Sequence, residues 1–403
     1  MDVLVANKFH YLRGGAEKNV FDEKKILAGL GHDILDFSMS HEENRPSEYS
    51  RYFAQNMDFT TVSSSIKGFP KGMNPAYNLD ARSRIEGLLT DHHVDAAHLH
   101  NIYHQLTPSI IAPLKKRDIN VVMTLHDYKL VCPNYLLYTG GRTCDRCGGK
   151  RYYNCLAHKC IKRSHLMSLY GCLQSYLTGL LGLYRKVDVF TSPSRFLIQK
   201  FRELGFRRPI THLPLPILAN EYRPDYGPGE YILYAGRVSA EKGLKTLITA
   251  CESAKMPLRI AGDGPQMTGL KEIVASKSID VEFLGHLDEP GLHDAVRGSM
   301  FTVVPSHWYE NQPYAILESF ALGKPVIGSD LGGIRELIMA GETGMLFEPG
   351  DPVDLADKIR ALIRLDLDGM GRTCRDWVIQ NHSPDKYGES LSLLLERRWI
   401  QKR

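Results

Sequence analysis

The chain has 403 residues, 43% of them hydrophobic and 24% charged, and its formal net charge at pH 7 is +4. This composition is typical of a soluble globular protein and excludes a highly charged, disordered chain. The length allows two domains of ordinary size or one large α/β unit. The charge is uneven, because residues 115–202 hold 16 Lys and Arg against 4 Asp and Glu. Such a segment favours an anionic partner (phosphate, acidic lipid or nucleic acid), with scattered solvated lysines as the alternative.

The N-terminal residues, MDVLVANKFHYLRGG, lack the basic start, long apolar stretch and small-residue cleavage site of a signal peptide. We therefore expect a cytoplasmic protein whose eight cysteines are reduced. Short runs rich in Val, Ile and Leu recur with helical patterns between them, which indicates an α/β fold. Five such runs predict strands in the first half: Asp2–Asn7, His32–Phe37, Asp95–His100, Asn120–Leu125 and Val187–Thr191.

A glycine pair follows the first predicted strand. The sequence FHYLRGGAEKNV leads into a helix, with Gly14 and Gly15 at its start and Glu17 in its first turn. Glycines at this place let the backbone approach a phosphate near the positive end of the helix dipole. Taken alone, the pair is a weak indication of a phosphate site.

Five cysteines lie within the 29 residues from Cys132 to Cys160. A C-x2-C pair followed by a C-x4-C pair has the spacing of tetrahedral zinc ligands. We therefore predict a structural zinc that braces a glycine-rich insertion, residues 132–160, with Cys132 as the spare thiol. Free thiols, disulfides or an iron–sulfur centre are the alternatives, and a zinc knuckle for nucleic acid is disfavoured. The expected ligands are Cys144, Cys147, Cys155 and Cys160.

An uncharged stretch, Leu166–Tyr184, follows the cysteines and approaches the length of a membrane-spanning helix. It also contains a glutamine, two serines, a threonine and three glycines, and basic residues flank it on both sides. We expect a helix buried in the protein. The alternatives are a helix lying on the bilayer, with its basic flanks facing anionic headgroups, and a spanning helix.

The second half repeats the α/β pattern after a linker, residues 213–230, that contains four prolines and two glycines. Near-continuous apolar strands are typical of parallel sheets covered on both faces. We predict two Rossmann-like doubly wound domains, 1–215 and 216–383, facing a central cleft where ligands bind. The predicted strands of the second domain are Tyr231–Tyr234, Leu258–Ala261, Val281–Leu284, Phe301–Val304 and Pro325–Gly328.

Two cations follow the first strand of the second domain. The sequence YILYAGRVSAEKGL places Arg237 and Lys242 after that strand and before a helix. Cations at such a position can neutralise a diphosphate and stabilise negative charge that develops on a leaving group.

Two glutamates flank the start of a later helix, in HWYENQPYAILESFALGKPVIGSD. Pro313 suits the first position of that helix, whose next amides can bind a phosphate. Glu310 precedes the helix, and Glu318 lies about a turn and a half inside it. A side chain at Glu318 leans toward the helix start and could accept both hydroxyls of a ribose. Two surface glutamates on an amphipathic helix are the alternative.

The chain resembles the retaining glycosyltransferases of family 4, which have the GT-B architecture of two Rossmann-like domains. The resemblance covers essentially the whole chain, and its motifs are specific as an ordered set. They are GGAE, TLHDY, TSPSRF, AGRVSAEKG, AGDGP, ENQPYAILESFALGKPVIGSDLGG and GETGMLFEPGD.

This resemblance implies roles for single residues. Glu310 would lie at the transferring sugar, and Glu318 would bind the donor ribose. Arg237 and Lys242 would hold the diphosphate, while His126 in TLHDY would approach the sugar from the N-terminal domain. The last helix, about 386–398 in the segment 384–403, would complete that domain. The implied donor-binding residues are Gly14, Gly15, Gly236, Gln312, Pro313, Tyr314 and Glu318.

The implied reaction moves a sugar from a nucleotide-diphosphate sugar to a hydroxyl of a glycan or a lipid-diphosphate-linked acceptor, with the anomeric configuration kept. Cell-surface polysaccharide synthesis is the expected setting, with peripheral contact to an anionic membrane. No catalytic metal and no nucleic acid partner are expected, and Asp366–Asp368 is expected to be solvated surface. An epimerase of the same fold and a non-catalytic nucleotide-sugar-binding protein are the alternatives.

Overall fold

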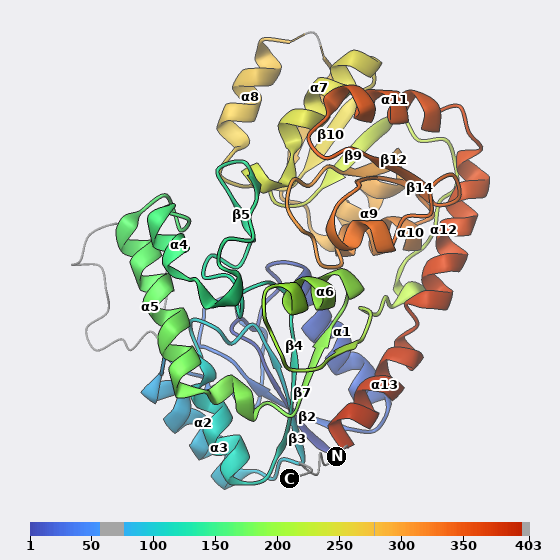
Figure 1. Cartoon of the computed structure of the whole chain (residues 1–403). Helices are drawn as coiled ribbons and strands as arrows, with labels where there is room; N and C mark the ends of the chain where they lie inside the picture. The colour runs from blue at the N-terminus through green and yellow to red at the C-terminus, as the bar shows by residue number, and fades with distance from the viewer. Residues whose placement is uncertain (57–75, 278, 397–403) are drawn as a thin grey trace. The chain divides into compact units, whose positions relative to one another are not determined.

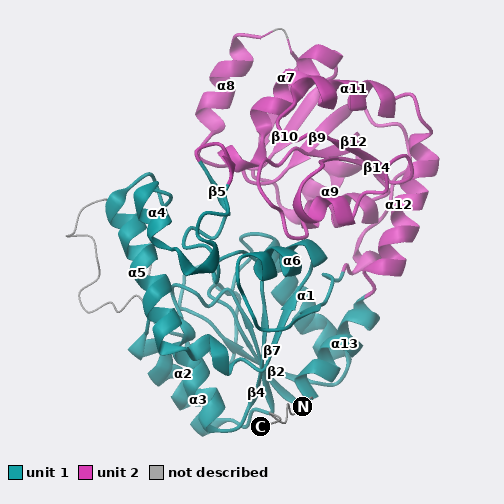
Figure 2. Cartoon of the chain, viewed as in Figure 1, with its two compact units in different colours: residues 1–139, 144–216, 384–403 teal, residues 140–143, 217–383 magenta. Residues whose placement is uncertain are grey.

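The computed structural model describes residues 1–56, 76–277 and 279–396. The chain divides into two compact units, which Figure 2 shows in different colours. Unit 1 comprises residues 1–139, 144–216 and 384–403, and unit 2 comprises residues 140–143 and 217–383.

Unit 1 is built on a six-stranded parallel sheet in the order β2-β1-β3-β4-β7-β8. The strands β3 and β4 are buried along their whole length, as expected for a sheet covered on both faces. The order reverses between β1 and β3, so their carboxyl ends flank a switch point. The strand bounds are β1 Asp2–Ala6, β2 Asp33–Phe37, β3 Ala96–His100, β4 Asn120–Thr124, β7 Val189–Ser192 and β8 Ile210–His212.

The helices of unit 1 cover both faces of this sheet (Figure 1). The helices α1 (Gly15–Gly29) and α13 (Pro384–Glu396) pack together on one face, and α2 (Leu79–Asp91) and α3 (Ile111–Lys116) pack on the other. The side chain of Asn120 in β4 donates to the carbonyl oxygens of Leu394 and Leu395, which fastens α13 to the sheet.

Side-chain caps explain where several of these helices begin. Asn78 accepts from the amide of Ala81 at the start of α2, and Ser194 does the same for Leu197 at the start of α6 (Arg195–Glu203). The short helix α4 (Tyr153–Ala157) precedes α5 (His165–Leu181) in the cysteine-rich region, which also contains the hairpin strands β5 (Tyr138–Thr139) and β6 (Arg142–Thr143).

The helix α5 differs from the buried helix expected from its composition. Its buried residues are Met167, Ser168, Gly171, Cys172 and Gln174, whereas five of its six leucines form an exposed stripe. That expectation was therefore wrong. Within the described ranges, no helix is both long and apolar enough to cross a membrane.

Unit 2 has a six-stranded parallel sheet in the order β11-β10-β9-β12-β13-β14, which is the Rossmann order. Its helices α7, α8 and α11 cover one face, and α9, α10 and α12 cover the other (Figure 1). The strands are β9 Tyr231–Ala235, β10 Leu258–Ala261, β11 Val281–Gly285, β12 Ser299–Val304, β13 Val326–Ser329 and β14 Gly344–Phe347. The helices are α7 Leu244–Ala254, α8 Met267–Ala275, α9 Glu289–Arg297, α10 Tyr314–Ala321, α11 Pro352–Leu362 and α12 Leu367–Asn381.

The predicted fold class, two Rossmann-like units with parallel sheets, is confirmed, and each of the ten predicted strands is present within two residues at its ends. The sequence missed β8 and β14 of the two large sheets and the two-residue hairpin strands β5 and β6. Asp366 caps α12 by accepting from the amide of Gly369, so it has a local structural role. The expected last helix reached beyond residue 396, and that part lies outside the described residues.

Candidate functional site

The candidate site of unit 2 lies where the order of the sheet reverses, between β9 and β12. The loop after β9 carries Gly236, Arg237 and Lys242, and the loop after β12 leads through Glu310 to α10. Ligands of doubly wound sheets bind beyond the carboxyl ends of the strands at this switch point.

Glu310 is the centre of a compact hydrogen-bond cluster. Its Oε1 atom lies 2.6 Å from Nζ of Lys242, and it accepts from Oγ of Ser306 at 2.6 Å and Nε1 of Trp308 at 2.8 Å. Only 6% of Glu310 is exposed, and Nζ of Lys242 also lies 5.3 Å from the centre of the Trp308 ring. Charge-assisted hydrogen bonds of this kind hold the carboxylate and the ammonium group in fixed positions.

Two glycines allow the loops to meet around this cluster. Gly243 has a φ of +73°, and a Cβ atom there would lie 1.9 Å from the carbonyl oxygen of Pro305. Gly332 has a φ of +64°, and a Cβ atom there would lie 2.7 Å from the carbonyl oxygen of Glu310. Any other residue at either position would be strained and would push a loop away. These glycines therefore explain how Lys242 comes within reach of Glu310.

The helix α10 starts directly after these loops. Pro313, with φ −71° and ψ 120°, precedes the first helical residue Tyr314, so the helix begins one residue later than predicted. The amide of Ile316 donates to the carbonyl of Pro313 at 3.1 Å. The first turn of a helix carries the positive end of its dipole, which suits an anion. Gln312 and Tyr314, both buried, lie on either side of Pro313.

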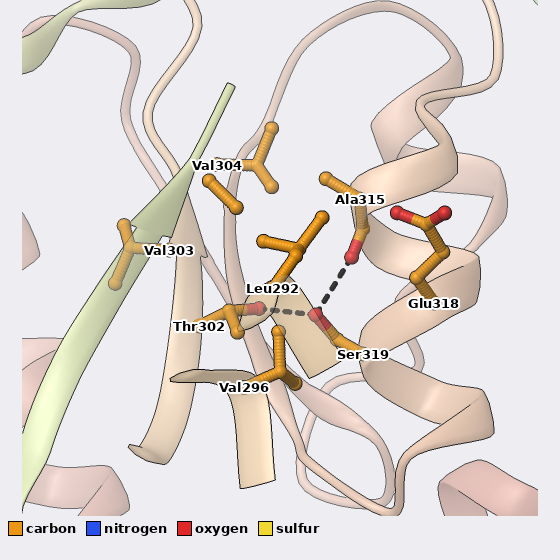
Figure 3. A pocket seen from close by; sticks show the side chains of 9 residues that line it. Leu292, Val296, Thr302, Val303, Val304, Ala315, Glu318 and Ser319 are labelled. Carbon is orange, nitrogen blue, oxygen red and sulfur yellow. Dashed lines mark hydrogen bonds between the residues drawn. The ribbon is translucent and has the colours of Figure 1, made fainter. Parts of the chain in front are cut away.

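Glu318 lines a small pocket between α9, α10 and β12 (Figure 3). Its carboxylate lies beside Ala315, one turn nearer the start of α10, as its position in the helix predicts. The hydroxyl of Tyr222 donates to Oε1 of Glu318 at 3.4 Å, and the Tyr222 ring lies tilted against the His293 ring, with 4.7 Å between the ring centres. The pocket residues are Ala235, Leu292, Val296, Thr302, Val303, Val304, Ala315, Glu318 and Ser319. The walls of this small pocket are mostly apolar, and Glu318 is the one charged side chain among its lining residues.

In unit 1, Gly14 precedes α1, and Gly15 is its first residue. Gly14 has a φ of −179°, an extended conformation that any residue adopts, and a Cβ atom there would have no neighbour closer than 3.8 Å. The backbone conformation therefore does not require glycine at this position. A glycine at position 14 would instead leave open space beside the start of α1. The role of Gly14 and Gly15 in donor binding stays a prediction.

His126 lies just beyond the end of β4 and is half-buried. Its Nε2 atom is 2.9 Å from Nδ1 of His100. Burial, followed by the nearby His100 and His98, holds the pKa of His126 well below its usual value, so the ring is neutral at pH 7.

The cysteine-rich region contains free thiols. None of the eight cysteines, all of which are described, takes part in a disulfide. Cys147, Cys155 and Cys172 form a small buried cluster with Tyr152, against which Cys160 packs. In the part of the chain that the structure describes, three or more metal-binding side chains come within 4.8 Å of one another at Glu23, His98 and His100 and at Asp2, His93 and Asp95, but not at the cysteines.

Two protein families match this chain, one over each of its two main parts. Residues 13–217 match the family described as Glycosyltransferase Family 4, and residues 222–391 match that described as Glycosyl transferases group 1. The first match alone covers half of the chain. The protein belongs to glycosyltransferase family 4.

Curated relatives of this family 4 protein align with about a third of the chain. A glycogen synthase from Mycobacterium tuberculosis is 34% identical over 148 residues, which are 35% of each chain. A phosphatidyl-myo-inositol mannosyltransferase from Mycobacterium leprae is 30% identical over 145 residues, 34% of this chain and 38% of that protein. The chain thus spans little more than a third of the length of these relatives.

Solved structures show the same fold over nearly the whole chain. HepE from Anabaena in complex with UDP has a TM-score of 0.69 and 16% identity, covering 98% of this chain and 99% of its own. Sucrose-phosphate synthase from Thermosynechococcus elongatus has a TM-score of 0.72 and 17% identity, covering 98% of both chains.

Three residues around the site of this family 4 protein were missed by sequence reasoning. Ser306 and Trp308 donate to Glu310, and Tyr222 donates to Glu318. The first two stand shortly before Glu310 and directly after an apolar strand, which is the only signal that the sequence carries for them. Tyr222 lies 96 residues before Glu318 in a proline-rich linker, and nothing in its surroundings predicts the contact.

Proposed function

We propose that this family 4 protein is a retaining glycosyltransferase that moves a sugar from a nucleotide-diphosphate sugar to a hydroxyl group. The observation that carries the proposal is the Glu310 cluster with Lys242 at the mouth of α10. Family membership supports it, and the relatives named above are, by their names, a glycogen synthase and a mannosyltransferase. HepE, a structural neighbour, is described in complex with UDP.

The donor would lie at the switch point of unit 2. Arg237 and Lys242 would neutralise the diphosphate together with the first turn of α10, next to Gly236, Gln312, Pro313 and Tyr314. Glu318 would accept hydrogen bonds from the two ribose hydroxyls. Glu310 would face the transferring sugar.

The reaction would break the bond between the anomeric carbon and the phosphate oxygen and form a bond from that carbon to the acceptor oxygen on the same face. The proton of the acceptor hydroxyl would pass to the departing phosphate. Catalysis would then depend on positioning and on charge stabilisation by Arg237 and Lys242, without a divalent metal. His126 would bind a hydroxyl of the sugar, and Gly14 and Gly15 would leave space for the substrate.

A two-step assay tests this proposal. A thermal-shift screen against UDP-, GDP- and ADP-sugars identifies the donor. Release of the nucleoside diphosphate is then measured with and without candidate glycan acceptors. A transferase releases it in proportion to acceptor, whereas an epimerase converts the sugar with no acceptor present. A non-catalytic binding protein would show stabilisation and no turnover in either case.

The proposed acceptor is a lipid-diphosphate-linked glycan, and the proposed docking surface is the exposed stripe of α5. Leu180 is 80% exposed and Leu173 is 48% exposed, while Lys162 and Arg163 precede the helix and Arg185 and Lys186 follow it. The full stripe is Leu169, Leu173, Tyr176, Leu177, Leu180 and Leu181. Leucines flanked by basic residues suit an anionic bilayer surface, which would hold the protein at the inner face of the membrane during polysaccharide synthesis.

We also propose a structural zinc in the cysteine-rich region, held by Cys147, Cys155, Cys160 and a fourth thiol. The spacing of the sequence favours Cys144 as the fourth, whereas Cys132 is the more deeply buried of the two. The thiol of Cys132, however, donates to Oδ1 of Asn134 at 2.9 Å, and a metal-bound thiolate has no proton for such a bond. Zn–S bonds of about 2.3 Å would draw the sulfurs closer together than they lie here.

Metal analysis separates these ligand sets. One zinc per chain is expected, and it should be lost from whichever of the Cys132→Ser and Cys144→Ser variants removes a ligand. Full metal content in the Cys155→Ser variant, or none in the unmodified protein, would contradict the zinc site.

A further inference from the structure

A hydrogen-bond network surrounds Glu23 of α1 in unit 1, and Glu23, His98 and His100 are all buried. Oε2 of Glu23 accepts from the hydroxyl of Tyr387 in α13 at 2.6 Å. Oε1 lies 2.6 Å from Nδ1 of His98, in the middle of β3, and 3.3 Å from Nε2 of His100, the last residue of that strand. The other side of the His100 ring contacts Nε2 of His126 at 2.9 Å. The network thus runs without interruption from the C-terminal helix to the predicted sugar-binding histidine.

Glu23, His98 and His100 have ligand atoms close enough together to hold a metal ion. The separation of 2.6 Å between Glu23 and His98 is a hydrogen-bond length, however. Two ligands on one ion at bond lengths of about 2.0–2.2 Å lie about 3 Å apart or more. The contacts therefore fit protons between these side chains better than a metal.

The charge of Glu23 determines where these protons lie. Burial alone would raise its pKa, but the contacts with His98 and His100 hold the pKa well below its usual value. Glu23 is thus a carboxylate, which can only accept hydrogen bonds. The nitrogen of His100 that faces it, Nε2, must therefore carry a proton.

The second proton position follows from the first. Burial and the neighbouring His98 lower the pKa of His100, so its ring is neutral and its Nδ1 atom has no proton. The contact between His100 and His126 then requires a proton on Nε2 of His126, because one of the two nitrogens must donate. Since the His126 ring is also neutral, its remaining nitrogen, Nδ1, carries a lone pair.

We propose that Glu23 and His100 are positioning residues that fix His126 in the tautomer with its proton on Nε2, so that Nδ1 accepts a hydrogen bond from a hydroxyl of the bound sugar. The tautomer itself depends only on unit 1, whereas the contact with sugar rests on the function proposed above. With the opposite tautomer, Nδ1 of His126 would present a donor, and two ring nitrogens without protons would face each other at 2.9 Å.

Two-bond ¹H–¹⁵N NMR spectra of the protein labelled with ¹⁵N-histidine test the tautomer directly, with a His126→Gln variant to assign the resonances. The expected pattern is that of a neutral ring with the proton on Nε2, at pH 7 and without any donor. A ring with its proton on Nδ1, or a charged ring, would overturn the proposal. This measurement needs no enzymatic activity, so it remains decisive if the protein proves not to be a transferase.

A matched pair of variants tests the positioning. Asparagine places its amide oxygen near the position of Nδ1, and glutamine places its amide near the position of Nε2. His100→Asn should therefore keep an acceptor for His126, the same tautomer and most of the activity. His100→Gln should give a mixture of tautomers and lower kcat/KM about 10- to 100-fold, the range found when the partner of a functional histidine is removed.

Far-UV circular dichroism and thermal melting establish that both variants are folded. If the two variants lose activity equally and both keep the tautomer of the unmodified protein, His100 has a structural role only, and the proposal is wrong. If the unmodified protein transfers no sugar from any donor, the tautomers of His126 in the two variants still show whether His100 fixes the proton on Nε2.

Discussion

Lys242 and Glu310 lie 68 residues apart in the sequence, yet their side chains form an ion pair with 2.6 Å between Nζ and Oε1. Ser306 and Trp308 donate to the same oxygen atom, so the carboxylate is held from three directions. This arrangement fixes one cation at the carboxyl end of the unit 2 sheet before any substrate binds. Preorganised charge of this kind stabilises a transition state without reorganisation during the reaction.

The variant Lys242→Ala should lower kcat by about 100-fold or more, because one of the two cations proposed to stabilise the departing diphosphate is removed. Its measure is the initial rate of nucleoside diphosphate release at saturating donor. The matched control is Lys245→Ala, since Lys245 is exposed in the first turn of the adjacent helix α7. A Lys242→Ala variant with the rate of the unmodified protein would contradict the proposed role.

The variant Trp308→Phe should keep a ring near Lys242 but lose the N–H donor to Glu310. We expect a free energy of unfolding lower by about 1–3 kcal/mol, since a buried charged acceptor loses one partner. Urea denaturation measures this change. The activity should fall less than in Lys242→Ala, and the reverse order of the two effects would show that the indole group matters more than the cation.

Replacement of Glu318 by glutamine should weaken binding of the donor nucleotide by about 10-fold, because the charged acceptor for the ribose hydroxyls becomes neutral. Isothermal titration calorimetry with a nucleoside diphosphate and its 2′-deoxy analogue provides the internal control. The unmodified protein should prefer the ribose form, and the Glu318→Gln variant should lose most of that preference. Equal preference in both proteins would place the ribose elsewhere.

Acid should destabilise unit 1 through His10. Burial, the largest effect, lowers the pKa of His10 to about 4, against 6.5 for an ordinary histidine. The unfolded chain therefore binds a proton first as the pH falls, so the free energy of unfolding should decrease between pH 6.5 and about pH 4. Urea denaturation at pH 7 and pH 5 should show a smaller loss for His10→Gln than for the unmodified protein. His286→Gln, at an exposed position, should change nothing.

Membrane contact should depend on the exposed leucines of α5. Flotation with vesicles that contain anionic lipid should recover the unmodified protein, and the Leu173→Ser/Leu180→Ser variant should remain at the bottom of the gradient. Leu79→Ser is a suitable control, because Leu79 is 71% exposed in a different helix of unit 1. Equal flotation with neutral and anionic vesicles would argue against the basic flanks.

Much of the fold was predictable because its strands are continuous apolar runs, as in β4 (Asn120–Thr124), which is buried throughout. The missed strands of the large sheets, β8 and β14, are short and only partly buried, so they leave no such pattern. For α5, composition was misleading. The helix buries small and polar residues such as Gly171 and Gln174 and exposes five of its six leucines, which no count of apolar residues can reveal.

For the candidate site, the sequence indicated residue types and their place at strand ends but not their contacts. It paired neither Lys242 with Glu310 nor Tyr222 with Glu318, because these contacts arise from segments far apart in the chain. The network from Tyr387 to His126 was hidden for the same reason, since α13 is last in sequence and packs against the first helix.

A crystal structure of the protein with a bound nucleoside diphosphate tests the central claim most directly. The account predicts phosphate oxygens within about 3 Å of Nζ of Lys242 and of the first amides of α10, with the ribose hydroxyls at Glu318. Density for the nucleotide away from α10, or a Lys242 ammonium group that does not contact the phosphates, would contradict it.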